Sequence, residues 1–228
     1  MTAPAPHTDA RRLPTRATAL MIGAAAVVAI GVTAWLATSS GAETAQTGMV
    51  RWFNDPPRPA SWVLALTNPL LRPVPLILVS AVLLGCVALT AGSRSSRLEI
   101  ARAAVIAALT AEVGAQILKR VADQARPFEV IEGLDSHGYP RDPIGHAYPS
   151  AHTAIVVAGV AGLWPWMRTW QRILGIAFAL AVALNRLYIG AHWPIDVLGG
   201  AAVGMVGAVI AWLTTERWPL SGRSRART

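Results

Sequence analysis

The chain has 228 residues, of which 54% are hydrophobic and only 14% are charged, and its mean hydropathy is +0.44. Soluble domains usually carry about 25% charged residues, so this composition argues against a soluble enzyme and favours a membrane protein. The net charge of +8 does not predict nucleic-acid binding, because most arginines stand in short segments between apolar runs. The single cysteine, Cys86, excludes an intramolecular disulfide and a cysteine-rich metal site.

Six apolar runs predict an all-α fold, namely an integral membrane bundle of six transmembrane helices. Each run can cross most or all of a hydrocarbon core of ~30 Å at a rise of ~1.5 Å per residue. Their approximate bounds are 17–37, 74–91, 98–118, 148–167, 172–190 and 193–214. A signal peptide is the alternative for the first run, although this run exceeds the usual apolar length of about 7–15 residues. The expected organisation is a cytoplasmic tail (1–16), a six-helix membrane domain (17–215) and a basic cytoplasmic tail (216–228).

The placement of arginine predicts the orientation in the membrane. The short connections and both tails are rich in arginine, whereas the longer loops 38–73 and 119–147 hold most of the acidic residues. By the positive-inside rule, this is a multi-pass cell-membrane protein with both termini in the cytoplasm. Residues 62–71 are expected to lie flat in the interface. An aromatic belt is predicted from tryptophans near the span ends: Trp35, Trp62, Trp164, Trp166, Trp193 and Trp212.

Polar residues gather at three points, all on the predicted outer side. They are Lys119 and Arg126 after the third run, Ser150 and His152 at the start of the fourth, and Arg186, His192 and Asp196 around the start of the sixth. Arginine and lysine bind phosphate oxygens, and the free N–H groups at a helix start also favour an anion. Together these groups predict a cradle for a phosphoryl group, whose transition state spreads negative charge over its oxygens.

The two histidines suggest a division of chemical roles. His192 and Asp196 are four residues apart at a helix start, so the carboxylate can accept a hydrogen bond from one ring nitrogen and leave the other free to attack. His152 is then the candidate general acid. Neither a metal nor a cofactor is expected, because the cations already neutralise the phosphate. Taken singly, the basic residues could be interface anchors and the His–Asp pair a helix-start contact, but their joint occurrence favours a site.

The same residues resemble the type 2 phosphatidic-acid phosphatase superfamily of membrane lipid phosphatases. Lys119 to Pro127 resembles the first signature (Lys, six residues, Arg-Pro), Pro149-Ser150-Ala151-His152 the second, and Asn185-Arg186, His192 and Asp196 the third. The resemblance covers about residues 60–215. It implies a six-helix bundle, a phosphohistidine on His192, His152 as acid, and phosphate bound by Lys119, Arg126, Ser150 and Arg186. Ala151 replaces the usual Gly, and Asn185 replaces the usual Ser, which affects the expected rate and substrate fit.

The resemblance implies a metal-independent hydrolase whose substrate is a membrane lipid phosphate in the bilayer, with its active site at the extracytoplasmic face. The candidate substrates are a polyprenyl diphosphate, phosphatidic acid and phosphatidylglycerol phosphate; the compact chain favours an undecaprenyl-diphosphatase-like enzyme of the cell-wall lipid carrier. The alternatives are a lipid phosphotransferase using the same site and a non-catalytic lipid transporter. The sequence does not specify an oligomeric state.

Several other residues invite an interpretation. Glu112, inside the third run, is expected either to lie beneath the phosphate site or to join helices as a paired or protonated group. Asp123, Tyr148 and Tyr188 are expected to line the entrance, and His137 and His146 to be solvated loop residues. Close helix packing is predicted at Gly200, Gly204 and Gly207.

Overall fold

The computed structural model describes residues 13–39, 41–57, 60–71, 73–90, 93–138 and 146–217, which form helices and turns with no strand. The α-helices are α1 (Arg16–Thr38), α2 (Ala42–Asn54), α3 (Ala60–Thr67), α4 (Pro73–Leu89), α5 (Arg94–Ala122), α6 (Pro127–Val130), α7 (Ala151–Leu163), α8 (Thr169–Tyr188) and α9 (Pro194–Arg217). Two 3-10 turns complete them, η1 (Asn68–Leu71) and η2 (Trp164–Trp166). The all-α prediction is confirmed, whereas most of the two predicted tails lies outside the described residues.

A helix occupies each of the six expected positions, as α1, α4, α5, α7, α8 and α9. Among the described residues, three stretches are long and apolar enough to cross a membrane by length and composition: Arg16–Thr38, Arg94–Val130 and Pro194–Glu216. The count of six spans therefore stays a prediction. The first long loop contains α2, which the sequence analysis did not predict, followed by α3 and η1 where an interfacial segment was expected.

Small residues bring α5, α7 and α9 into close contact. Along α5, a stripe at every fourth position is buried: Ala103, Ala107, Ala111, Ala115 and finally Lys119. Residues four apart share one helix face, so the alanines allow the neighbouring helices to approach and Lys119 emerges on the same face. The packing of the membrane helix thus determines where this cation lies.

The glycines of α9 complete this contact. A methyl group at Gly204 would lie 2.5 Å from the Ala154 carbonyl oxygen of α7, and one at Gly207 would lie 2.6 Å from the Ala107 carbonyl oxygen of α5. Only a residue without a side chain allows backbones to approach so closely. The predicted close packing at these glycines is confirmed.

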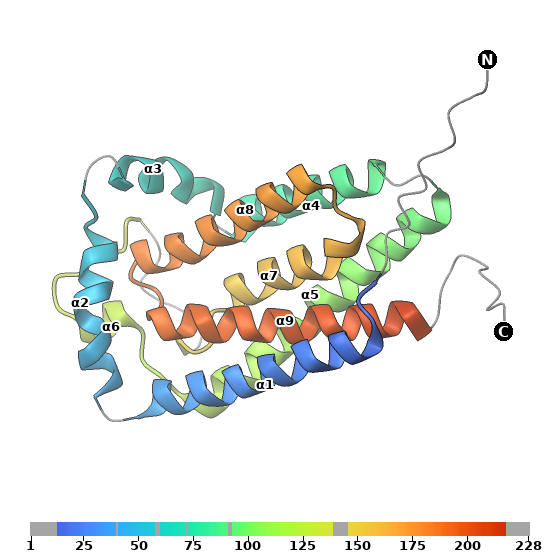
Figure 1. Ribbon diagram of the computed structural model, residues 1–228. Coiled ribbons are helices and arrows are strands. Elements are labelled where there is room, and N and C mark those ends of the chain that lie inside the picture. The colour runs from blue at the N-terminus through green and yellow to red at the C-terminus, as the bar shows by residue number, and fades with distance from the viewer. Residues whose placement is uncertain are drawn as a thin grey trace, which may run out of the picture.

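Two ends of the bundle can be distinguished in Figure 1. At the first, the site end, α5 finishes, α7 and α9 begin, and α2 crosses the bundle. At the other, the terminal end, α1 begins and α9 ends; α1 lies along α9, with Ala19 packed against Val209 and Trp212. The aromatic-belt prediction is wrong for Trp166, Trp193 and Trp212, which are buried within the protein.

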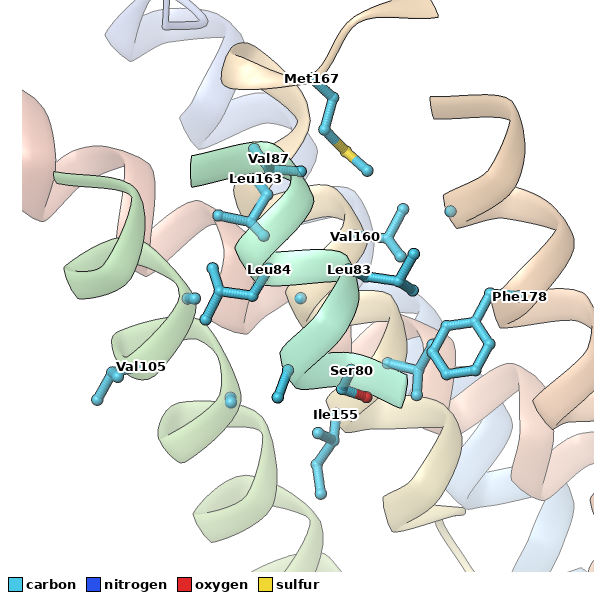
Figure 2. A pocket seen from close by; sticks show the side chains of 16 residues that line it. Ser80, Leu83, Leu84, Val87, Val105, Ile155, Val160, Leu163, Met167 and Phe178 are labelled. Carbon is cyan, nitrogen blue, oxygen red and sulfur yellow. The ribbon is translucent and has the colours of Figure 1, made fainter. Parts of the chain in front are cut away.

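Two apolar cavities flank α7. The smaller, about 250 Å³, lies between α4, α5, α7 and α8, where Leu83, Ile155 and Phe178 line it (Figure 2). The larger, about 600 Å³, lies between α1, α7, α8 and α9. Its lining runs from Thr153 near the site end to Trp164 and Trp212 near the terminal end, so it follows the bundle over much of its height.

Candidate active site

Lys119 lies at the end of the alanine stripe of α5 and is 7% exposed. Its Nζ donates to the carbonyl oxygen of His146 and, at 3.3 Å, to that of Ala147. The helix ends just beyond, where Asp123 adopts a left-handed conformation with a φ of 45°. Backbone carbonyls from the loop before α7 thus hold the ammonium group at the site end.

Arg126 is the N-cap residue of the short helix α6. Its backbone N–H donates to Glu129 Oε2 at 2.8 Å, which caps this turn. Its side chain is buried and donates from Nη1 to the carbonyl oxygen of Ala191 at 3.1 Å. The guanidinium therefore reaches the α8–α9 connection, next to His192.

Ser150 and His152 stand at the start of α7. Ser150 is fully buried; its N–H donates to the Asp196 carbonyl oxygen at 3.0 Å, and its Oγ accepts a hydrogen bond from Thr153 Oγ1 at 3.1 Å. His152 lies in the first turn of the helix and is partly buried. The start of α7 is thereby joined directly to the start of α9.

His192 and Asp196 form the predicted pair at the start of α9. The His192 Nδ1 lies 3.4 Å from Asp196 Oδ2, and the same oxygen accepts a 2.7 Å hydrogen bond from the backbone N–H of Trp193. Asp196 is fully buried and His192 is 3% exposed. If Nδ1 carries the proton that faces the carboxylate, Nε2 is the ring nitrogen with a lone pair for attack.

The cations affect the charge state of His192. Burial, followed by the nearby charges of Arg126, Lys119 and Arg186 and then His152, holds the pKa of His192 well below its usual value of about 6.5. The ring is therefore neutral at physiological pH, as a nucleophile must be. Three cations and a second histidine, from four separate segments, thus act together on the charge state of His192.

Arg186 comes from α8 and is fully buried. Its Nη2 donates to the carbonyl oxygen of Leu71 at 3.0 Å and to Asn185 Oδ1. Asn185 Nδ2 in turn donates to Asn68 Oδ1 at 3.0 Å. The turn η1 thus contributes to the site, a role that no motif in the sequence indicated for Asn68 or Leu71.

Two expectations about the entrance are wrong. Tyr148 is fully buried, and its hydroxyl lies 2.8 Å from Thr33 Oγ1, so it joins the loop to α1. Tyr188 is also buried, and its ring stacks on His137 at a centroid distance of 3.8 Å.

Of the two loop histidines, His137 is more enclosed than expected: its side chain is 21% exposed, and its Nε2 lies 2.9 Å from the carbonyl oxygen of Asn54. His146 is 42% exposed at its side chain and pairs through Nδ1 with Asp123 Oδ1 at 2.8 Å. Glu112 accepts a hydrogen bond from Gln116 of its own helix at 2.7 Å. That contact neither crosses to another helix nor reaches the site, so it favours neither expected role.

A sequence profile of the PAP2 superfamily matches residues 100–219, which is just over half of the chain. This chain belongs to the PAP2 superfamily. The matched region contains all seven candidate site residues. The family resemblance noted from the three motifs is thereby confirmed.

The names of individual relatives of this PAP2 protein refer to different phosphorylated substrates. The chain is 34% identical to an undecaprenyl-diphosphatase of Sulfolobus acidocaldarius over 112 residues, which are 49% of this chain and 52% of that protein. It is also 34% identical to human glucose-6-phosphatase 3 over 101 residues, which are 37% of this chain and 28% of that protein. The chain spans about half the length of the first curated relatives that it matches.

The fold also has a solved counterpart. The structure of a transmembrane PAP2-type phosphatidylglycerolphosphate phosphatase from Bacillus subtilis superposes with a TM-score of 0.65. The superposition covers 90% of this chain and 98% of that chain at 15% identity. The overall helical arrangement is therefore that of a membrane PAP2 protein.

Proposed function

We propose that this PAP2 protein is a membrane lipid phosphatase that works through a phosphohistidine on His192. The observation that carries the proposal is the neutral, buried His192, held by Asp196 and surrounded by Lys119, Arg126 and Arg186. A neutral imidazole among cations is suited to attack an anionic phosphorus centre, because the cations offset the charge of the phosphate. A carrier or anchor protein would have no need of this combination.

In the first step, His192 Nε2 attacks the phosphorus atom while the bond from phosphorus to the leaving oxygen breaks. Lys119, Arg126, Arg186 and the start of α7 at Ser150 bind the phosphoryl oxygens. The negative charge of the bound phosphate favours the protonated form of His152, which then donates its proton to the leaving oxygen. Asp196 stabilises the positive charge that develops on the His192 ring, since its carboxylate faces Nδ1.

In the second step, water attacks the phosphohistidine. His152, now neutral, accepts a proton from the water as its oxygen bonds to phosphorus, and the phosphorus–nitrogen bond breaks. Phosphate leaves, and both histidines return to their starting states. The seven residues supply all the acid, base and charge stabilisation that the reaction needs, so we propose that hydrolysis is independent of a metal.

The larger cavity supports a lipid substrate. It is lined mainly by apolar side chains from α1, α7, α8 and α9. Near the site end its lining includes Thr153, whose hydroxyl donates to Ser150 Oγ. A phosphate group bound at Ser150 would therefore lie next to one end of this cavity, which forms an apolar groove along the bundle. We propose that the hydrocarbon tail occupies this groove and that the substrate is a polyprenyl diphosphate, consistent with the name of the Sulfolobus acidocaldarius relative.

We further propose that the site end faces the outside of the cell and that both termini are cytoplasmic. The arginine-rich segments Arg94–Arg97 and Arg168–Arg172 lie toward the terminal end, as the positive-inside rule requires. Reporter fusions at Ser95 and Asp135 test this orientation. An inside signal at Asp135 contradicts it.

A substrate panel tests the proposed activity. Purified protein in detergent is incubated with polyprenyl diphosphate, phosphatidic acid, phosphatidylglycerol phosphate and glucose 6-phosphate, and released phosphate is measured. We expect release from the lipids, fastest from polyprenyl diphosphate, and an acid-labile phosphoprotein after rapid quenching. A new phosphorylated product without free phosphate would indicate phosphotransfer, and no turnover of any lipid would contradict the proposal.

A further inference from the structure

Two asparagine side chains, Asn68 and Asn185, connect the loop at His137 to Arg186 through successive hydrogen bonds. Asn68 Nδ2 donates to the carbonyl oxygen of His137 at 3.0 Å, and Asn68 Oδ1 accepts from Asn185 Nδ2 at 3.0 Å. Asn185 Oδ1 then accepts a hydrogen bond from Arg186 Nη2. Each amide donates through its nitrogen and accepts through its oxygen, so every link fixes the orientation of the next.

The side chains that form these hydrogen bonds are buried. Asn185 and Arg186 are fully buried, and Asn68 is 6% exposed. A buried amide that loses one partner leaves an unsatisfied polar group, which is costly. Turning the Asn185 amide around would direct its NH₂ group at the guanidinium, where two donors would face each other. The orientation of Asn185 is therefore set by Asn68 on one side and by Arg186 on the other.

Arg186 needs such an anchor because of where its helix lies. Figure 1 shows α8 on the far side of α7 from α9, outside the close contact of α5, α7 and α9. Its guanidinium is held from η1, through Asn185 and through the Leu71 carbonyl oxygen, which Nη2 also contacts at 3.0 Å. Two residues of one short turn, Asn68 and Leu71, thus act on the same nitrogen.

We infer that Asn68 and Asn185 are positioning residues that fix the Arg186 guanidinium for phosphate binding. The inference rests on the proposed role of Arg186 in the phosphate site. It also gives a physical role to the asparagine that this chain has where the third signature of the family usually has serine. Serine has a shorter side chain with a single hydroxyl in place of the carbonyl oxygen and the NH₂ group, so it cannot bridge Arg186 and Asn68 as the amide does.

The test measures binding of inorganic phosphate to the full-length protein in detergent, from the shift of the thermal unfolding midpoint with phosphate concentration. We expect Asn68→Ala and Asn185→Ser each to raise the Kd for phosphate by about tenfold, the loss that one buried hydrogen bond predicts. Gln171→Ala is the matched control. Gln171 is a buried amide at the other end of α8, bonded to the Cys86 carbonyl oxygen, and its loss should leave the Kd unchanged.

A second comparison separates positioning from general stability. In an Arg186→Ala background, Asn68→Ala should change the phosphate Kd no further, because the residue through which it acts is absent. A full additional loss in that background, or a wild-type Kd in Asn68→Ala, would overturn the inference. If Asn68→Ala does not fold, Asn185→Ser carries the same comparison. Phosphate release from polyprenyl diphosphate is measured on the same wild-type sample; its absence would contradict the proposed function while the binding data still decide the inference.

Discussion

Two regions of the molecule hold the cations of the proposed phosphate site by different means. Lys119 extends from the α5–α7–α9 contact, where an alanine stripe and glycines fix the helix, and its ammonium donates to backbone carbonyls. Arg186 extends from the more loosely packed α8 and is held by side-chain amides and by η1. Close packing fixes a cation through the position of its helix, whereas the second region fixes it through hydrogen bonds between the end of α8 and the turn η1.

The largest effect is expected at the point where both regions meet, His192. Replacing His192 with Ala removes the nucleophile and should lower phosphate release on the order of 10⁴-fold or more, as for other covalent catalysts. Initial rates with polyprenyl diphosphate, normalised to monodisperse protein by size exclusion, measure the change. An Asp196→Asn variant should retain more activity, because it still has Nε2 for attack. Unchanged hydrolysis in His192→Ala would exclude the phosphohistidine mechanism.

The closely packed region is tested by the same substitution at two glycines. In Gly204→Ala the new methyl would meet the Ala154 carbonyl oxygen at 2.5 Å, so we expect a destabilisation of about 1–3 kcal/mol and a parallel loss of activity. In Gly159→Ala the new methyl has no neighbour within 4 Å, and the protein should become slightly more stable, by about 0.4–1 kcal/mol. Thermal unfolding in detergent compares the two. Equal effects would mean that the α7–α9 contact is looser than the structure indicates.

The difference between the regions also explains what the sequence could predict. The glycines of α9 are a local pattern, and close helix packing was predicted from them. The alanine periodicity of α5, which carries Lys119 on its buried face, is an equally local pattern. The motif spacing likewise predicted that His192 and Asp196 share a helix start. These features depend on residues only a few positions apart.

The rest of the site could not be predicted, because it depends on contacts between distant segments. Asn68 meets Asn185 across 117 positions, and Asn54 meets Tyr188 across 134. Asn54 and Asn68 belong to no periodic pattern or motif. The stacking of His137 on Tyr188 has the same origin: a polar loop residue was expected to be solvated, but distant segments enclose it in part, and its side chain is 21% exposed. The helix α2 was missed because it is short and partly polar, although its apolar residues recur with helical spacing.

The loosely packed region is tested by filling its cavities. Ala201 lines the larger cavity and Ala108 the smaller, and both are partly buried. If the tail occupies the larger groove, Ala201→Phe should lower kcat/KM for a long polyprenyl diphosphate by about tenfold and barely affect a short, soluble prenyl diphosphate. Ala108→Phe should leave both rates nearly unchanged. The reverse pattern would assign the tail to the cavity of Figure 2.

The smallest expected effect is that of removing divalent cations. Lys119, Arg126 and Arg186 together bring three positive charges to the proposed phosphate site, one from α5, one from the start of α6 and one from α8. Charge stabilisation of the transition state, which a metal supplies in many phosphatases, is here assigned to these side chains. Phosphate release should therefore be unchanged after dialysis against EDTA, with a magnesium-dependent phosphatase treated in parallel as the control. Loss of activity that added Mg²⁺ restores would show that the three side chains do not suffice. Part of the charge stabilisation assigned to Arg186 and the other two cations would then belong to the metal ion.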